Sequence, residues 1–309
     1  MKKSKQILSA PKFIIFILFM VFVIVIDVCV IAGADKYRIL GLFGLSDFSH
    51  SADGYDLSVH FIDVGKSDSV FISFGETSIL IDTGCASLDG TAKKYIEHYG
   101  AEKLDLVIAA YTDPDHLGDI GSIAEKIPIK KLLLSEYDHA LTDPKAAEIY
   151  QQLKLYDIKT EHTEAGKTYR FGELSLEILS PCKDYDSRNN NSLAVRLAYK
   201  DVSFLFAGNA LKTAERDMIQ NYPKKINSDV LLLSHSGGNE ATTQEFLDAV
   251  SPVYVIISAS EYDLYHPHRD VIDRIEGTGA KLLRTDKDGT IIVATNGDDL
   301  KFFLSGKNC

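Results

Sequence analysis

The sequence predicts an α/β protein whose strands form the centre of each half of the main domain and whose helices lie on the outside. Three observations predict this class. Short apolar runs of strand length alternate along the chain with segments of helical spacing. Apolar residues make up 45% of the 309 residues and charged residues 25%, as in globular proteins with a substantial core. Residues 106–110 are apolar throughout, which is typical of a strand buried on both faces.

The first 34 residues differ from the rest of the chain. Three of the first five residues are lysines, and residues 13–32 form a nearly unbroken apolar run in which Asp27 is the only charge. This length suits a transmembrane helix, and the preceding lysines favour a cytoplasmic N-terminus. Alternatively, the segment is a signal peptide cleaved after Ala34, because Ala32-Gly33-Ala34 fits a cleavage site. We predict a membrane anchor over 1–34, a linker over 35–56 and an extracytoplasmic domain over 57–309, which would be secreted if Ala34 is a cleavage site.

Charge and cysteine content narrow the classes of partner. The net charge of −11 argues against a generic polyanion binder, so nucleic acid is a disfavoured partner. The chain has 4 cysteines, too few for a disulfide-stapled scaffold. A bridge between Cys85 and Cys182 is compatible with an exported domain, but the sequence does not establish the pairing.

The elements of the main domain follow from apolar periodicity. Helical spacing is found around residues 118–127, 146–153, 246–250 and 271–275. Hairpins are expected at Phe74-Gly75-Glu76-Thr77 and at Asn296-Gly297-Asp298. Strands are expected at 57–64, 70–73, 79–81, 106–110, 131–134, 174–179, 193–199, 202–206, 230–233, 253–257, 281–283, 291–294 and 300–304.

A cluster of polar residues directly follows the buried strand at 106–110. Asp113, Asp115 and His116 would lie in the loop between this strand and the next helix. Carboxylate oxygens beside an imidazole suit a divalent metal such as zinc or manganese. A solvated acidic turn with a chance histidine is the alternative. Asp63 and Asp82 end two other strands, where an aspartate before glycine is most often a turn former.

Eight short motifs carry a resemblance to a known family. They are His60-Phe61-Ile62-Asp63-Val64-Gly65-Lys66-Ser67-Asp68-Ser69, Ile81-Asp82-Thr83-Gly84, Asp113-Pro114-Asp115-His116-Leu117-Gly118, Asn189-Asn190-Asn191-Ser192-Leu193, Phe206-Ala207-Gly208-Asn209, Ser234-His235-Ser236-Gly237-Gly238, Tyr265-His266-Pro267-His268 and Arg284-Thr285-Asp286-Lys287-Asp288-Gly289. In this order they resemble the metallo-β-lactamase superfamily, specifically the extracellular domain of ComEC-type competence proteins. The resemblance covers residues 57–295.

The resemblance implies a four-layer αβ/βα sandwich with a metal site at the edge between its halves, and hydrolysis of ester, amide or phosphodiester bonds. Carried over residue by residue, it implies three sets of site residues. The metal ligands would be Asp113, Asp115, His116, Asn209, His235 and His266; the catalytic residues Asp115, Asp113 and Asp82; and the other lining residues Asp63, Asp68, Tyr111 and Ser236.

Three positions depart from the family pattern. Tyr111 replaces a histidine that helps to hold the first ion, and a phenol is a poor ligand at neutral pH. Asn209 replaces the aspartate that bridges both ions, and Ser236 replaces the second residue of a double histidine. We therefore expect one mixed nitrogen and oxygen site for one zinc or manganese ion, or no ion. His268 is expected at an exposed helix start, and Asn191 and Ser192 in structural roles.

Three functions are compatible with these residues. The first is a membrane-anchored metallohydrolase with a small-molecule or phosphodiester substrate, in which an ion lowers the pKa of a bound water and Asp113 or Asp82 acts as base. The second is a degenerate member that binds a ligand or protein at the cell surface. The third is an accessory factor in DNA uptake that works with a separate channel.

Overall fold

The computed structural model describes residues 48–85, 90–139 and 144–306. The chain divides into a unit Met1–Ser51 and a unit Ala52–Cys309. The predicted apolar anchor at 13–32 lies outside the described residues, so its prediction stays untested. Within the described ranges, no helix has the length and apolar character needed to cross a membrane. The following paragraphs concern the second unit.

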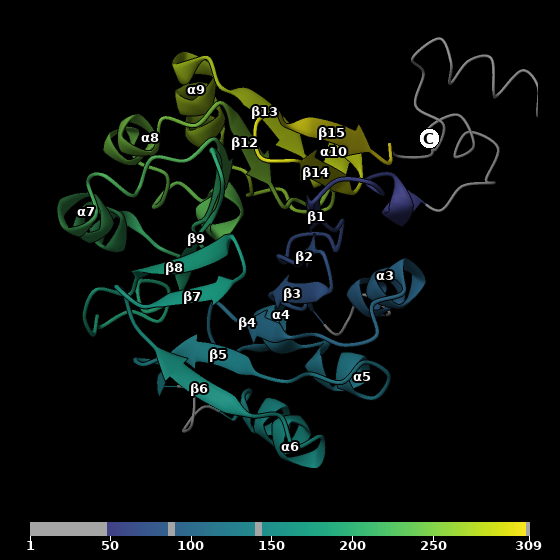
Figure 1. Cartoon of the computed structure of the whole chain (residues 1–309). Helices are drawn as coiled ribbons and strands as arrows, with labels where there is room; N and C mark the ends of the chain where they lie inside the picture. The colour runs from purple at the N-terminus through teal and green to yellow at the C-terminus, as the bar shows by residue number, and fades with distance from the viewer. Residues whose placement is uncertain (1–47, 86–89, 140–143, 307–309) are drawn as a thin grey trace, which may run out of the picture. The chain divides into compact units, whose positions relative to one another are not determined.

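The first sheet has eight strands and joins the beginning and the end of the domain (Figure 1). Its strands from β15 to β3 are antiparallel, and those from β3 to β6 are parallel. In spatial order they are β15 (Lys301–Leu304), β14 (Ile291–Thr295), β1 (Leu57–Phe61), β2 (Val70–Phe74), β3 (Thr77–Ile81), β4 (Leu106–Ile108), β5 (Leu132–Ser135) and β6 (Thr160–Thr163).

The second sheet has seven strands. Strands β10 to β13 are parallel, whereas β7 to β10 are antiparallel. In spatial order they are β13 (Lys281–Arg284), β12 (Tyr254–Ile257), β11 (Val230–Leu232), β10 (Val202–Phe206), β9 (Ala194–Tyr199), β8 (Leu174–Ser180) and β7 (Thr168–Phe171).

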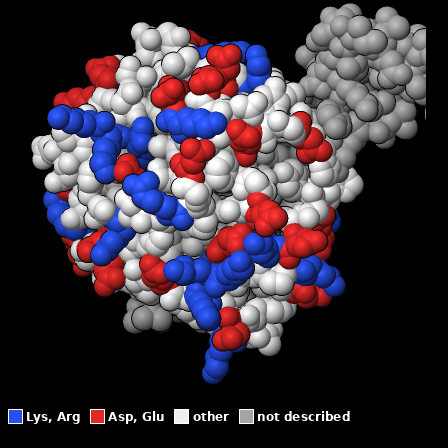
Figure 2. Space-filling model, viewed as in Figure 1, with Lys and Arg blue, Asp and Glu red and all other residues white. Residues whose placement is uncertain are grey.

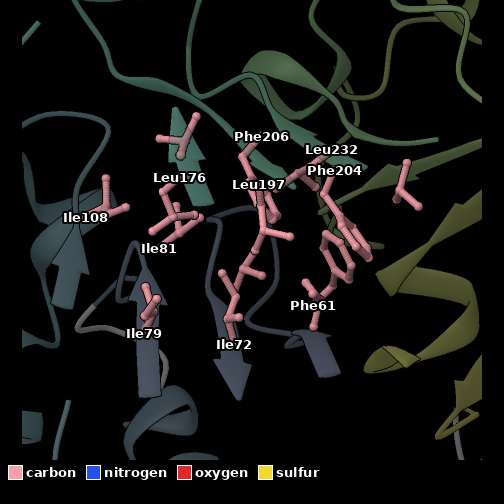
Figure 3. Packing of buried hydrophobic residues seen from close by; sticks show 14 of the residues in the cluster. Phe61, Ile72, Ile79, Ile81, Ile108, Leu176, Leu197, Phe204, Phe206 and Leu232 are labelled. Atoms are coloured by element: carbon pink, nitrogen blue, oxygen red, sulfur yellow. The ribbon is translucent and has the colours of Figure 1, made fainter. Parts of the chain in front are cut away.

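The two sheets pack face to face through one apolar core (Figure 3). Phe61, Ile72 and Ile79 of the first sheet and Phe204 and Leu197 of the second belong to this cluster and are fully buried. Alternate residues of β1 to β3 enter it, which is the period-2 pattern of a strand with one face on the core. Burial of each such side chain stabilises the fold by roughly 1.5–3 kcal/mol.

Helices cover the outer face of each sheet (Figure 1). A second apolar cluster packs α3 (Thr91–Tyr99), α5 (Ile120–Ala124) and α6 (Ala147–Leu155) against the first sheet. A third packs α7 (Lys212–Asn221), α8 (Gln244–Val250) and α9 (Arg269–Thr278) against the second. The predicted four-layer αβ/βα sandwich is therefore confirmed.

The charged side chains are of both signs on the surface. On the face in Figure 2, lysine and arginine are interspersed with aspartate and glutamate. That face therefore carries no continuous basic surface of the kind that nucleic-acid backbones need.

Candidate functional site

The candidate site lies where parallel strands of both sheets end. Asp82 follows β3, Tyr111 follows β4, Asn209 follows β10 and His235 follows β11. Because the carboxyl ends of parallel strands share one edge of a sheet, the two edges bring these side chains together. They surround a pocket of about 370 Å³. Its lining residues are Gly65, Lys66, Ser67, Asp68, Cys85, Tyr111, Asp115, His116, Asn209, His235, Ser236 and Ser260.

A short helix, α4 (Pro114–Leu117), holds two of the predicted site residues. The loop expected at this point is wrong, because Asp113 caps the helix by accepting the Asp115 N–H at 2.8 Å and Pro114 occupies its first turn. His116 is buried on this helix, whereas Asp115 is exposed at the pocket. The predicted cluster of polar residues is thus fixed by helix capping rather than by a free loop.

Three side chains form a hydrogen-bonded series across the pocket, and Tyr111 lies beside it; we call these four residues the Asp82 series. The Asp82 Oδ2 atom lies 2.9 Å from His116 Nδ1, and the Asn209 amide lies 2.9 Å from His116 Nε2. The Asn209 side chain also acts on the Tyr111 hydroxyl, where it favours the ionised phenol. The Tyr111 and His116 rings are 4.8 Å apart. The two residues that depart most from the family pattern therefore both lie against the retained histidine.

Charge around the Asp82 series favours a protonated imidazole. Burial alone would lower the pKa of His116, but the charge and hydrogen bond of Asp82, with Asp68 and Asp113 nearby, raise it to about 9. Asn209 suits both states of this ring, because its amide donates to a bare Nε2 and, turned over, accepts from Nε2–H. Burial and the charge of Asp113 raise the pKa of Tyr111 to about 12, so Tyr111 is a neutral phenol.

Asp68 is a buried carboxyl group in the wall of the pocket. Burial and the charge of Asp82 raise its pKa to about 7, against the lowering effects of a Ser258 hydrogen bond and of His116. Its Oδ1 atom is buried and has no hydrogen-bond partner. A buried acceptor without a partner is costly, which agrees with the raised pKa, because a protonated carboxyl is less costly to bury than a carboxylate.

The second half of the chain contributes a pair of imidazoles. The His235 and His266 rings are 5.6 Å apart and nearly perpendicular. Burial and the charges of His266 and Lys66 lower the pKa of His235. His266 Nδ1 lies 3.1 Å from Asp263, which also pairs with Lys66 at 3.0 Å. Burial opposes ionisation of Asp263, but hydrogen bonds from Tyr265 and Lys66, with the charge of Lys66, lower its pKa to about 2.

Two residues of the pocket lining, and Asp82 beside them, have strained backbone. Asp82, His235 and Ser236 have φ angles of 54°, 51° and 50°, in the left-handed region that non-glycine residues rarely adopt. Each such residue costs roughly 1–3 kcal/mol and persists only where its surroundings hold it. Strain of this kind is frequent at functional sites, although four other non-glycine residues with positive φ lie elsewhere in the described chain.

Arg188 is a site residue that the motifs did not reveal. Its guanidinium carbon lies 5.0 Å from the centre of the Tyr111 ring, and Nη2 lies 3.5 Å from Asp113 Oδ2. Its position before the asparagine cluster carries no sequence signal for this contact, since the contact joins residues 75 apart.

The other predicted residues have mixed outcomes. Ser236 lines the pocket and donates a hydrogen bond to the Lys66 carbonyl at 2.8 Å. Asp63 is not among the lining residues, and its carboxylate accepts the Gly65 N–H, as a turn former does. No disulfide joins Cys85 and Cys182. His268 is confirmed as the N-cap of α9.

The donor set does not fit the two-ion centre of the family. Among residues 48–85, 90–139 and 144–306, no three His, Cys, Asp or Glu side chains gather into a group that could hold a metal ion. Asn209 and Tyr111 supply neutral groups at two of the predicted ligand positions, and Asn209 covers Nε2 of His116. The roles of Asp113, Asp115, His116, Asn209, His235 and His266 as ligands stay predictions.

Comparison with known proteins gives a family match over more than half of the chain. The family model of the metallo-beta-lactamase superfamily matches residues 62–260. ComE operon protein 3 of Bacillus subtilis (strain 168) is 28% identical over 254 residues, 75% of this chain and 32% of that protein. Competence protein ComA of Neisseria gonorrhoeae is 27% identical over 264 residues, 84% of this chain and 35% of that protein. The chain thus spans about a third of the length of the curated relatives it matches.

Solved structures share the fold at low sequence identity. The metallo-beta-lactamase fold protein YhfI from Bacillus subtilis has a TM-score of 0.52 and 14% identity, over 80% of this chain and 100% of YhfI. CmlA, a diiron beta-hydroxylase from Streptomyces venezuelae, has a TM-score of 0.53 and 16% identity, over 79% of this chain and 57% of CmlA. At such identities the likeness concerns the fold alone.

Proposed function

The chain belongs to the metallo-beta-lactamase superfamily as a ComEC-like member, and from this premise we propose that its pocket binds a small polar ligand without the two-ion centre. The pocket is lined by residues at the positions of the family's metal site, but the substituted residues offer different chemical groups. The domain would then act as a binding module rather than as a two-metal hydrolase.

The Asp82 series is the observation that carries this proposal. A bridging carboxylate would draw cations into the centre of the pocket, whereas Asn209 places a neutral amide there that contacts His116. An imidazolium between Asp82 and Asn209 has no lone pair to offer a metal. Asp82, His116 and Asn209 are thus engaged with one another rather than directed at an ion.

The remaining walls of the pocket favour a small ligand with hydrogen-bonding groups. A volume of about 370 Å³ is near the lower end for small-molecule sites. Asp68 and His235 line the pocket, and burial lowers the pKa of the His235 ring. Tyr111 adds an aromatic face.

The location of the domain is part of the proposal. The apolar segment at 13–32 and the lysines before it support a single membrane anchor with the domain outside the cell. The name of the Neisseria relative, a competence protein, supports a role in DNA uptake. This chain spans about a third of the length of these curated relatives. We propose that it acts in DNA uptake as an accessory surface domain.

A metal and activity assay tests the binding proposal. The full-length chain and an Asp115→Ala/His116→Ala variant are compared for bound zinc and manganese by elemental analysis, and for hydrolysis of a chromogenic phosphodiester and ester with either ion. We expect less than one ion per chain and equal inertness of both proteins, with cooperative melting of the wild type. Stoichiometric metal, with hydrolysis that the variant loses, would overturn the proposal.

A one-ion hydrolase is the second candidate, and one observation favours it. Asp82 bonds to Nδ1 of His116 and so directs Nε2 into the pocket, as second-shell carboxylates do for metal-binding histidines. Asp115, His116 and His235 would hold a zinc or manganese ion only if the Asn209 amide turned away and the three side chains moved closer together, since they form no such group in the described residues. The assay above separates the two candidates.

A further inference from the structure

Tyr111 and Asp113 lie at the positions where the family holds its first ion, and both contact the guanidinium of Arg188. The Arg188 guanidinium stacks on Tyr111 at 5.0 Å and lies 3.5 Å from Asp113 Oδ2. The Asp113 side chain is only 14% exposed, so this carboxylate is largely shielded from water and its contact with the guanidinium is correspondingly less screened. Arginine remains protonated at any pH at which the protein is folded.

The backbone that carries Arg188 is held in place by a neighbouring asparagine. The Asn191 side chain accepts the Tyr185 N–H at 2.7 Å and donates to the Tyr185 carbonyl at 2.9 Å and to Asp184 at 3.0 Å. Its backbone N–H bonds to Ser187 at 3.0 Å. The segment 184–191 is therefore a tied loop, which confirms the structural role predicted for Asn191 and fixes the base of the arginine.

The contact between Asp113 and Arg188 determines whether a metal ion can bind at Asp113. Asp113 already uses Oδ1 to accept the Asp115 N–H and presents Oδ2 to Arg188. A divalent ion at Asp113 would have to displace the guanidinium or lie beside it, and two cations at such a distance repel each other.

We propose that Arg188 takes the place of the first metal ion: its guanidinium neutralises Asp113 and excludes a divalent cation from this side of the pocket. The role of Arg188 rests on the proposed function of the pocket, but it concerns only the side of Asp113. The exclusion of an ion by Arg188 holds whether or not the His116 side binds an ion, so this proposal and the proposed function can fail separately.

Restoring the family's ligands gives a direct test. The full-length chain with Tyr111→His and Asn209→Asp is titrated with manganese and with zinc by calorimetry, and its metal content is measured after desalting. The same pair is then combined with Arg188→Gln. We expect Arg188→Gln to add a further equivalent of ion or to tighten binding about tenfold or more, since it removes a charge next to the ligand.

Three controls separate the charge of Arg188 from its bulk and from general effects. Arg188→Lys keeps a cation and should recover part of the exclusion. Lys183→Gln removes a similarly exposed cation that stacks on Tyr185 at 5.1 Å but pairs with Asp217, so it should change nothing. Arg188→Gln alone, compared with wild type, serves if the restored pair fails to fold.

The decisive comparison is that of metal binding by the chain with Arg188 and by the chain with Arg188→Gln. Equal metal binding with and without Arg188 overturns the proposal, whether both proteins bind ions or neither does. Tight binding of one ion by the wild type, with hydrolysis, would instead contradict the proposed function and leave this comparison to decide the role of Arg188.

Discussion

The two sides of the pocket differ in how they use their histidines. On the first side, His116 is buried, charged and bonded at both nitrogens, to Asp82 and to Asn209. On the second side, burial lowers the pKa of His235, and this ring contacts His266 edge to face. We therefore call the first side closed, because its imidazole is bonded at both nitrogens, and the second side open. What differs is thus whether the imidazole is engaged at both nitrogens, and the engaged one lies on the side that carries Tyr111 and Asn209.

The closed side remains stable because its replacements match each other. Asn209 contacts His116 and acts on the Tyr111 hydroxyl, and Arg188 stacks on the tyrosine. Loss of the Asn209 contact alone would leave the buried Nε2 of His116 unsatisfied, at a cost of roughly 1–3 kcal/mol. Four experiments test the contrast between the two sides.

The largest effect is expected from Asp82→Ala. This change removes the partner of a buried imidazolium and the acceptor of the Ala110 N–H, so the free energy of unfolding should fall by roughly 3–5 kcal/mol. Urea denaturation at pH 7 measures it. Asp82→Asn, which keeps an acceptor for Ala110, should cost less, and His235→Ala less still. Equal costs for Asp82→Ala and His235→Ala would contradict the contrast.

The pH dependence of stability should reveal the charged histidine. Because folding raises the pKa of His116 from 6.5 to about 9, its contribution is complete below pH 6.5 and is lost as the pH rises through 9. The loss amounts to about 3 kcal/mol in a series of urea titrations across this range. Asp68, raised from 3.8 to about 7, adds a loss of the same sign at lower pH. A His116→Gln variant should be flat above pH 7, and an unchanged slope in it would assign the effect elsewhere.

Much of the fold, and less of the site, could be predicted from sequence. Buried strands such as β4 are apolar throughout and were predicted at the right place, as was the β2–β3 hairpin. Edge strand β6 (Thr160–Thr163) was missed because it has no apolar side chain, and β7 (Thr168–Phe171) because its alternation spans only four residues, with Tyr169 and Phe171 on the core side. The helix α7 was missed because only Ala214, Glu215 and Met218 of it are buried.

The same limit applies to the contacts within the site. Motifs placed Asp82, His116, Asn209 and His235 at strand ends, and parallel pairing then brings those ends together. No motif gives the direction of a side chain, so the contact between Asn209 and His116 could not be predicted. Arg188 carries no motif at all and reaches Asp113 only through tertiary structure.

Asn209→Ala should have an intermediate effect. It leaves Nε2 of His116 and the hydroxyl of Tyr111 without this partner, and we expect a loss of roughly 1–3 kcal/mol in the free energy of unfolding. Differential scanning calorimetry at pH 7 measures it as a lower Tm. His266→Ala on the open side is the matched control and should lower the Tm less. A larger loss for His266→Ala would reverse the assignment of closed and open sides.

Tyr111→Phe should have the smallest effect and sharpens the contrast most. It removes only the hydroxyl, on which Asn209 acts, and keeps the ring on which Arg188 stacks, so the cost should be at most about 1 kcal/mol. In a double-mutant cycle with Asn209→Ala, this cost should vanish, because the hydroxyl has then already lost its partner. A cycle of Tyr111→Phe with His235→Ala should be additive, since His235 belongs to the other side. Coupling in the second cycle rather than the first would mean that the two sides act as one network.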